Sequence, residues 1–187
     1  MRLGCVLLAS GFARRFGSNK LLLPLQGGSP AQRALALFSP ERFARRAVVS
    51  QFPEILELGR AAGWLALDNP EAAEGIASSL RRGLAAMEEM DGVLFAVCDQ
   101  PWLSKASVDR LIDAFTAQPA CITALSWAGE RGNPVIFPRD LLRELAALTG
   151  DTGGSAVLRA HSGRLLLVEA LSARELLDVD TPRDLDS

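Results

Sequence analysis

Residues 1–20, MRLGCVLLASGFARRFGSNK, place a short apolar run directly before a loop rich in glycine and basic residues. The run from Arg2 to Ala9 is apolar at successive positions, which is typical of a strand buried on both faces of a parallel sheet. In open α/β sheets, ligands bind beyond the carboxyl ends of the strands, where the loop from Leu8 to Lys20 would lie. This stretch therefore predicts an α/β fold with a ligand-binding loop after its first strand.

The loop has the chemical features of a phosphate-binding turn. Gly11 and Gly17 allow tight turns in which backbone N–H groups face anionic oxygens. Arg15 adds a bidentate cation and Lys20 a mobile one. The glycine spacing matches neither the P-loop nor the dinucleotide fingerprint GxGxxG. On its own such a loop could equally be a surface turn, so the rest of the chain must decide between the two.

The remaining sequence alternates short strand-like runs with helical periods. We expect further strands at 47–50, 64–67, 92–98, 120–127, 135–137 and 164–170, and helices at 30–37 after the Ser29 cap, at 53–62, at 76–89, after the Ser104 cap and after Pro138. This alternation predicts a single Rossmann-like α/β domain over residues 1–187, with a mostly parallel sheet covered by helices on both faces.

The composition excludes several classes of protein. A net charge of only -2 argues against a nucleic-acid-binding surface, and the apolar first run is too short to span a membrane. Cys5, Cys98 and Cys121 lie in apolar runs without metal-ligand spacing, so we interpret them as small buried thiols. We therefore expect a cytoplasmic protein that binds neither nucleic acid nor a membrane.

Carboxylates follow two of the predicted extended segments. Asp99 comes directly after the apolar run 93–97, at the tip of a central strand, where it could hold Mg²⁺ over a triphosphate or simply cap a turn. Asp178 and Asp180 share one side of a second strand-like stretch, which stops at Thr181-Pro182. Mg²⁺ takes few protein ligands, so Asp99 and one of this pair would suffice.

These motifs together resemble the nucleotidyltransferases related to molybdenum cofactor cytidylyltransferase. The loop from Leu8 to Lys20 is similar to that family's LAAGxSxRxGxxK signature. The other matching segments occur in the family's order and cover essentially the whole chain: Asn69-Pro70 with Gly75-Ile76-Ala77-Ser78-Ser79-Leu80, Cys98-Asp99-Gln100-Pro101, Gly132-Asn133-Pro134-Val135, Gly150-Asp151 with Gly153, and the closing stretch Asp178 to Leu185. The resemblance implies the fold of the nucleotide-diphospho-sugar transferases.

The resemblance also implies roles for particular residues. Three residues would be catalytic, namely Arg15, Lys20 and Asp99. Arg15 and Lys20 would contact the triphosphate, and Asp99 would bind Mg²⁺. Asp180 would be the second metal ligand, with Asp178 in reserve. The nucleotide would bind to the loop and to two polar residues further along the chain, namely Leu8, Ala9, Ser10, Gly11, Arg15, Lys20, Asn69 and Ser79.

Two departures from the family pattern affect the choice of base. The second loop alanine of the family is Ser10 here, and the serine before the arginine is Ala13. In the family, glycine at the position of Ser10 accompanies guanine, and alanine at this position accompanies cytosine. Serine is close to alanine in size, so the resemblance favours CTP over GTP. The reaction it implies is transfer of CMP to a molybdopterin-type acceptor, with a molybdoenzyme as a candidate partner.

Two other functions remain open from the sequence. The chain could be a guanylyltransferase, or another nucleotidyltransferase that acts on a different phosphorylated small molecule. It could instead be a non-catalytic chaperone that binds molybdenum cofactor. A carrier would not need Arg15, Lys20, Asp99 and Asp180 together, so their presence favours an enzyme.

Overall fold

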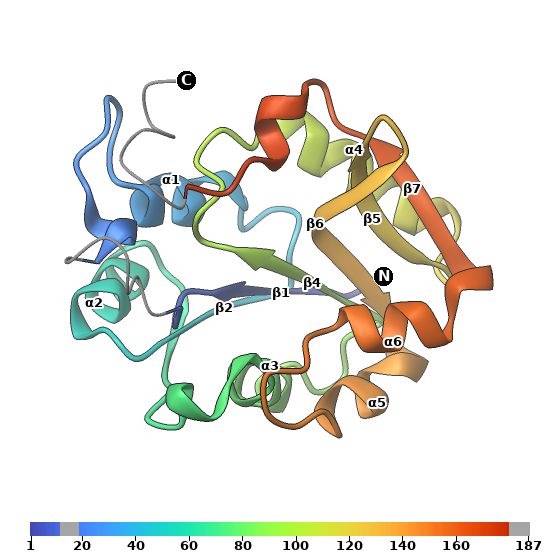
Figure 1. Ribbon diagram of the computed structural model, residues 1–187, viewed down its shortest axis with the longest axis horizontal. Helices are drawn as coiled ribbons and strands as arrows, with labels where there is room; N and C mark the ends of the chain where they lie inside the picture. The colour runs from blue at the N-terminus through green and yellow to red at the C-terminus, as the bar shows by residue number, and fades with distance from the viewer. Residues whose placement is uncertain (12–18, 180–187) are drawn as a thin grey trace.

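The computed structural model describes residues 1–11 and 19–179. In this part of the chain the strands form one sheet in the order β3-β2-β1-β4-β6-β5-β7 (Figure 1). Neighbouring strands are parallel except at β6, which runs antiparallel to both β4 and β5. The strands are β1 Leu3–Leu8, β2 Arg45–Ser50, β3 Leu65–Asp68, β4 Gly92–Val97, β5 Ile122–Trp127, β6 Glu130–Pro138 and β7 Leu165–Glu169. The expected mostly parallel sheet is confirmed.

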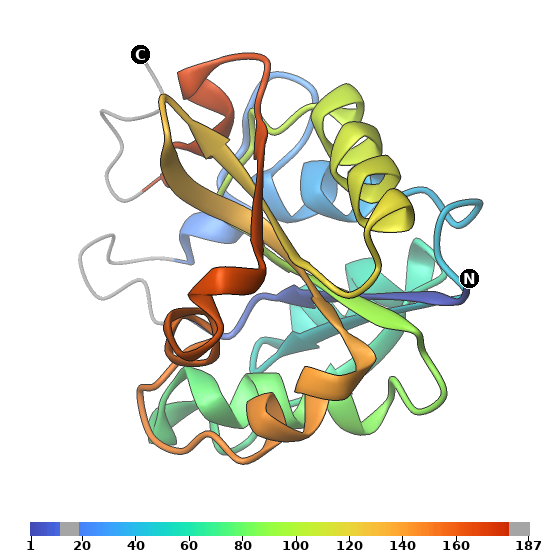
Figure 2. The ribbon, with the colours of Figure 1, turned by 90° about the vertical axis from the view of Figure 1, so that its right-hand side faces the viewer.

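Helices cover both faces of this sheet, as predicted (Figures 1 and 2). One face packs against α1 (Pro30–Leu37), α2 (Pro53–Ala61) and α4 (Lys105–Ala117), with Leu7 and Leu94 in its core. The other packs against α3 (Ile76–Ala85), α5 (Leu142–Ala146) and α6 (Ser155–Ala160), with Val6 and Phe95 in its core. Because successive residues of β1 enter opposite cores, this strand is apolar throughout.

The predicted helix caps are present. Ser29 accepts a hydrogen bond from the Gln32 backbone N–H, the Gln32 side chain accepts one from the Ser29 N–H, and Pro30 occupies the first turn. The Ser104 side chain accepts a hydrogen bond from the Ser107 N–H at the start of α4. No helix in residues 1–11 or 19–179 is long and apolar enough to cross a membrane.

Three boundaries differ from the sequence-based prediction. The helix expected to end at residue 89 ends at Ala85, although Met87 remains buried beyond it. The strand expected at 135–137 is the nine-residue β6, because Ala128 and Gly129 take positive φ and let the polar residues from Glu130 onwards pair with β5. The strand expected at 178–180 is not formed in its described residues, which have no regular secondary structure.

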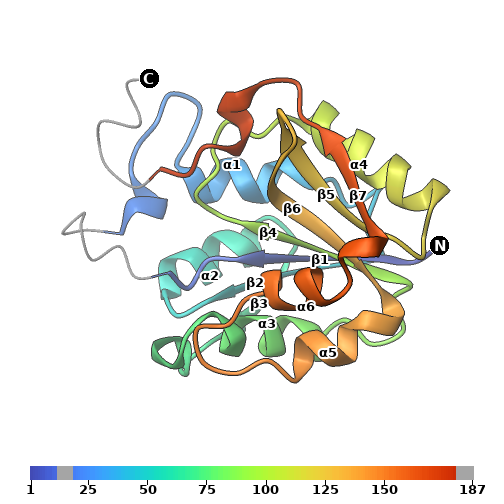
Figure 3. The same cartoon turned by 45° about the vertical axis from the view of Figure 1, so that its right-hand side comes forward.

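The central strands β1 and β4 lie side by side and end together (Figure 3). Their register pairs Leu8 with Val97, so the first loop and the Asp99 turn leave the sheet at the same edge. This arrangement brings together residues that are about eighty positions apart in the sequence, and it creates the position of the candidate site.

Candidate active site

A cleft of about 570 Å³ opens at the carboxyl ends of β1 and β4. It contains seven of the residues predicted from the sequence: Leu8, Ala9, Ser10, Gly11, Lys20, Ser79 and Asp99. The cleft is also lined by Glu74 and Gly75 from the turn before α3, by Ile76 at the first position of α3, and by Asp151. Arg15 and Asp180, which were also predicted to belong to the site, lie outside the described residues.

Lys20 and Asp99 face each other across this cleft. The Lys20 Nζ atom lies 2.7 Å from Asp99 Oδ2, and the two side chains are only 13% and 24% exposed. The Asn19 side chain fixes the turn that carries Lys20, because its Oδ1 accepts a hydrogen bond from the Leu21 N–H at 3.1 Å. The site therefore holds a cation and a carboxylate in direct contact, in surroundings where water screens them less than at the surface.

The start of the first loop is held by residues at the end of β2. Ser50 Oγ donates to the Ala9 carbonyl at 2.9 Å, and Gln51 Nε2 donates to the Ser10 carbonyl at 2.6 Å. The Ser10 hydroxyl donates to the Val49 carbonyl at 3.2 Å, so it points into the sheet edge. Sequence reasoning missed Ser50 and Gln51, although polar residues directly after a strand at the ligand-binding edge were a usable signal.

Asn69 plays a different part from the one predicted. It is buried and does not line the cleft, and its Nδ2 donates to Ser78 Oγ at 3.0 Å and to Ser79 Oγ at 2.9 Å. Ser79 does line the cleft, so Asn69 fixes the rotamer of a residue that a ligand can reach. The sequence motif placed both residues near the site but could not show that Ser79 lines the cleft while Asn69 only holds Ser79 in place.

The turn before α3 depends on Gly75. Its φ of 110° lies in a region that favours glycine, and an added Cβ would lie 2.5 Å from the carbonyl carbon and oxygen of Gly150. The Ala77 N–H donates to the same Gly150 carbonyl at 3.2 Å. This contact places Asp151 beside the first turn of α3, where its carboxylate lines the cleft.

The segment that leads to the last motif is attached to the Asp99 turn. Gln100 Nε2 donates to the Leu176 carbonyl at 3.2 Å and to Asp178 Oδ1 at 2.9 Å, and the Val179 N–H donates to the Asp99 carbonyl at 2.9 Å. Asp178 is exposed and is not part of the cleft wall, and its assignment as a reserve metal ligand stays a prediction. Sequence reasoning gave Gln100 no role.

Glu175 provides a second attachment for the same segment. This buried carboxylate accepts hydrogen bonds from the Ser104 N–H at 3.0 Å and from the Ser104 hydroxyl at 2.9 Å, at the start of α4. A carboxylate at a helix N-terminus is stabilised by the free N–H groups and by the helix dipole. Residues 175–179 are thus fixed to both ends of the turn that carries Asp99.

Oxygen donors in this region suit a hard divalent cation. The carboxylates of Asp99 and Asp178 lie on segments that are hydrogen-bonded to each other, and Asp180 comes two residues after Asp178. Mg²⁺ prefers a small number of carboxylate ligands and leaves other positions for water and phosphate oxygens. The carboxylates of Asp99 and Asp178 are therefore chemically suited to a divalent cation beside the Asp99 turn.

Cys98 also lines the cleft, but its environment makes it unreactive. Burial raises the pKa of the Cys98 thiol well above its usual range, and the neighbouring charge of Asp99 raises it further. Burial likewise raises the pKa of Cys5. The prediction that the cysteines are buried holds for these two but is wrong for Cys121, which is partly exposed because it precedes β5 instead of lying within it.

The chain matches a known protein family over most of its length. The model of the MobA-like NTP transferase domain family matches residues 5–165. PucB, a purine catabolism protein of Bacillus subtilis, is 30% identical over 97% of this chain and 93% of its own length. Nicotine blue oxidoreductase of Paenarthrobacter nicotinovorans is 26% identical over 94% of this chain and 91% of its own length. These relatives carry unlike names, so the reaction must be argued from the site.

Solved structures share the fold over nearly the whole chain. A nucleotidyl transferase from Methanothermobacter thermautotroptrophicus has a TM-score of 0.82, with 24% identity over 98% of this chain and 94% of its own. The Rv0371c protein of Mycobacterium tuberculosis, in complex with manganese, has a TM-score of 0.74, with 27% identity over the full length of both chains. The predicted nucleotide-diphospho-sugar transferase fold is thereby confirmed.

Proposed function

Because the chain belongs to the MobA-like NTP transferase domain family, we propose that it transfers CMP from CTP to a molybdopterin-type acceptor in a Mg²⁺-dependent reaction. An oxygen of the acceptor phosphate attacks the α-phosphorus of CTP. The bond between the α-phosphorus and the bridging oxygen breaks, and pyrophosphate leaves with that oxygen. A phosphate acceptor is already ionised at neutral pH, so the reaction needs no general base.

One observation carries this proposal. Lys20 and Asp99 come from different strand ends and meet inside a cleft that is also lined by the backbone of Ser10 and Gly11. Phosphoryl-type transfer depends mainly on positioning and on the neutralisation of charge, and this pair supplies a cation for phosphate oxygens and a carboxylate for a metal ion. A simple surface turn would not require the two groups to converge.

Each residue of the site has its own role in the proposed reaction. Lys20 stabilises charge that develops at the α-phosphorus, and Arg15 is assigned to the triphosphate by its position in the loop motif. Asp99 holds Mg²⁺ with Asp180 as the second ligand, or with Asp178 in its place. The bound magnesium ion neutralises phosphate charge. Ser79, held by Asn69, and Gly75 border the nucleotide.

The environment of Ser10 supports CTP as the nucleotide. The hydroxyl donates its hydrogen to the Val49 carbonyl, and the residue is 9% exposed, so it presents a wall similar in size to that of alanine. We expect Ser10→Ala to keep the CTP preference and Ser10→Gly to raise the relative rate with GTP. A matched pair of this kind separates the size of the side chain from its hydrogen bond.

The test is pyrophosphate release with Mg²⁺ and each of CTP, GTP, UTP and ATP, with and without molybdenum cofactor. Acceptor-dependent release with CTP alone is the expected result. Release with GTP would favour the guanylyltransferase alternative and discard the assignment of Ser10. Tight nucleotide binding by calorimetry without any release, even with purified cofactor, would favour the carrier alternative and overturn the proposed reaction.

A further inference from the structure

One carboxylate in the cleft has no part in the reaction proposed above. Asp99, Glu74 and Asp151 all line this cleft. Asp99 contacts Lys20 at 2.7 Å. Glu74 Oε2 lies 3.7 Å from Arg81 Nη2. In the part of the chain that the structure describes, no cationic side chain lies within the 4.0 Å ion-pair distance of Asp151. A ligand in the cleft therefore meets a carboxylate that none of the described side chains neutralises.

The position of this carboxylate is fixed by contacts with the start of α3. The Gly150 carbonyl accepts a hydrogen bond from the Ala77 N–H at 3.2 Å. Asp151 Oδ1 accepts one from the Ile76 N–H at 3.5 Å, which is long for such a bond. Its other oxygen, Oδ2, accepts no hydrogen bond from the described residues, and Asp151 is exposed. The backbone thus holds Asp151 in place, while its carboxylate keeps acceptor positions for a ligand.

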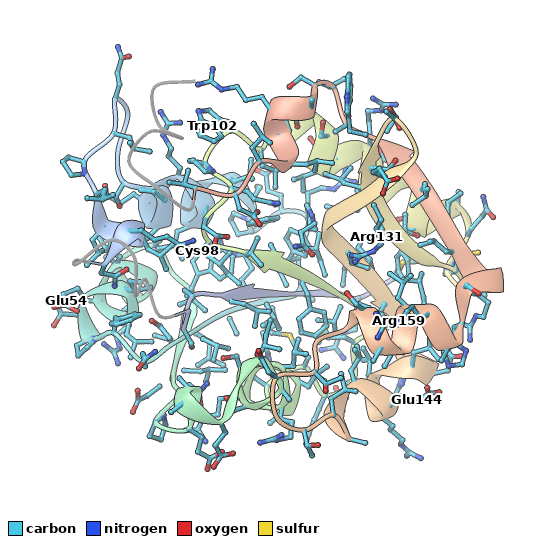
Figure 4. The ribbon with its side chains drawn as sticks, in the orientation of Figure 1. Glu54, Cys98, Trp102, Arg131, Glu144 and Arg159 are labelled. Atoms are coloured by element: carbon cyan, nitrogen blue, oxygen red, sulfur yellow. The ribbon has the colours of Figure 1, made fainter. Side chains whose placement is uncertain are left out.

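Asp151 and Lys20 line different walls of the cleft. Lys20 begins the short helix η1 (Lys20–Leu22), which contacts α1 on one face of the sheet. Asp151 lies beside α3 on the other face (Figures 1 and 3). Cys98, labelled directly after β4 in Figure 4, also lines the cleft. Phosphate oxygens are attracted by a lysine and repelled by a carboxylate. The triphosphate therefore belongs beside Lys20, and the part of the nucleotide beside Asp151 is uncharged.

The base is assigned to another part of the site. In the proposed reaction it lies against Ser10, whose hydroxyl donates to the Val49 carbonyl and whose carbonyl accepts from Gln51. Ser10 is thus attached to the end of β2, whereas Asp151 belongs to the turn that packs on α3. The sugar joins the base to the α-phosphate. It is therefore the remaining uncharged part of the nucleotide that can face Asp151.

We propose that Asp151 binds the ribose hydroxyl groups of the nucleotide and thereby selects a ribonucleoside triphosphate over its 2′-deoxy counterpart. This inference rests on the proposed nucleotidyl transfer and names a specificity-determining residue for it. An ionised carboxylate only accepts hydrogen bonds, and the 2′ and 3′ hydroxyls are two adjacent donors. Acidic side chains bind the ribose 2′-OH in the same way in dinucleotide-binding α/β folds. A 2′-deoxy sugar would leave one of these bonds unmade.

Calorimetry with CTP and 2′-dCTP tests this inference, in the presence of Mg²⁺ and without an acceptor, so that no transfer takes place. The full-length protein should bind CTP roughly tenfold more tightly than 2′-dCTP, because a hydrogen bond to a charged group contributes on this scale. Asp151→Ala should bind both nucleotides with the affinity that the unchanged protein has for 2′-dCTP. Asp151→Asn keeps an oxygen for the Ile76 N–H, so it should fold normally and show an intermediate preference. Glu74→Gln removes a charge from the same cleft and should leave the preference unchanged.

The steady-state rates give a second readout. Asp151→Asn should raise the KM for CTP several-fold with little change in kcat, because the ribose contact is the same in the bound substrate and in the transition state.

Three results would overturn the role of Asp151. Equal weakening of CTP and 2′-dCTP in Asp151→Asn would mean that the residue only supports the turn. Loss of the preference for CTP over UTP in this variant would mean that it binds the amino group of the base. A loss of affinity that excess Mg²⁺ restores would mean that it is a metal ligand. Binding is measured without turnover, so a protein that prefers CTP to 2′-dCTP but transfers nothing would contradict the proposed reaction alone.

Discussion

Lys20 Nζ lies 2.7 Å from Asp99 Oδ2, which connects the end of the first loop directly to the turn after β4. The two residues follow neighbouring parallel strands, and the register of Leu8 with Val97 brings the strand ends level. This contact keeps a lysine charge and a carboxylate in a partly shielded cleft before any substrate is present. When a metal–triphosphate complex binds, Lys20 would pair with phosphate oxygens and Asp99 with the metal ion in place of each other.

Substitution of either member of this pair should remove most of the activity. We expect Asp99→Asn and Lys20→Met each to lower kcat at least roughly 100-fold, because each removes a charge that the transition state needs. The double variant should lose less than the product of the two effects, since the residues act as a unit. Pyrophosphate release at saturating CTP and Mg²⁺ measures this, with circular dichroism as the control for folding. More than half of the normal rate in Asp99→Asn would refute the metal assignment.

Replacement of Gly75 should lower the stability of the protein. The alanine Cβ would meet the Gly150 backbone at 2.5 Å, at a φ of 110° that L residues rarely adopt, so we expect Gly75→Ala to cost about 3 kcal/mol of unfolding free energy. Gly163→Ala is the matched control, because no atom lies within 4 Å of its added Cβ. Urea denaturation of both variants measures the difference. Equal midpoints would show that the turn relaxes.

Apolar patterns and caps in the sequence were sufficient to predict the fold. The run from Arg2 to Ala9 and the caps at Ser29 and Ser104 depend on local chemistry, and they appear in the structure as expected. The polar first half of β6 could not be predicted in this way, because residues from Glu130 onwards are held in the strand by pairing with β5. Propensity is a weak guide where tertiary pairing decides.

The candidate site could also be predicted only in part from the sequence. Motifs identified residues that line the cleft, such as Lys20, Ser79 and Asp99, because strand ends converge at one edge of the sheet. They could not identify residues that act through another residue. Asn69 and Gln100 belong to motifs but are held against Ser79 and Asp178, and only three-dimensional contacts reveal these partners.

The three thiols should differ in reactivity. Burial and the charge of Asp99 raise the pKa of Cys98, so its thiolate is scarce at neutral pH and becomes available only at a pH well above the usual range. Cys121 is partly exposed and should be alkylated by iodoacetamide at least roughly tenfold faster than Cys98 or Cys5. Peptide mass spectrometry of a time course at pH 7.5 and pH 9 measures the order. Early modification of Cys98 at pH 7.5 would contradict its burial.

Gln100 should control the metal requirement without taking part in the reaction. Gln100 is 6% exposed, and its amide donates to both the Leu176 carbonyl and Asp178, so Gln100→Leu removes two hydrogen bonds and loosens residues 176–179 from the Asp99 turn. We expect the Mg²⁺ concentration for half-maximal rate to rise roughly tenfold, while the rate at saturating Mg²⁺ changes by less than about threefold. The affinity for Mn²⁺, measured by electron paramagnetic resonance, should fall in parallel.

Glu144→Gln, which weakens the surface contact with His161, serves as a control that alters neither the metal requirement nor the rate. A loss of rate that Mg²⁺ cannot restore would mean that Gln100 contacts substrate instead of positioning the metal site.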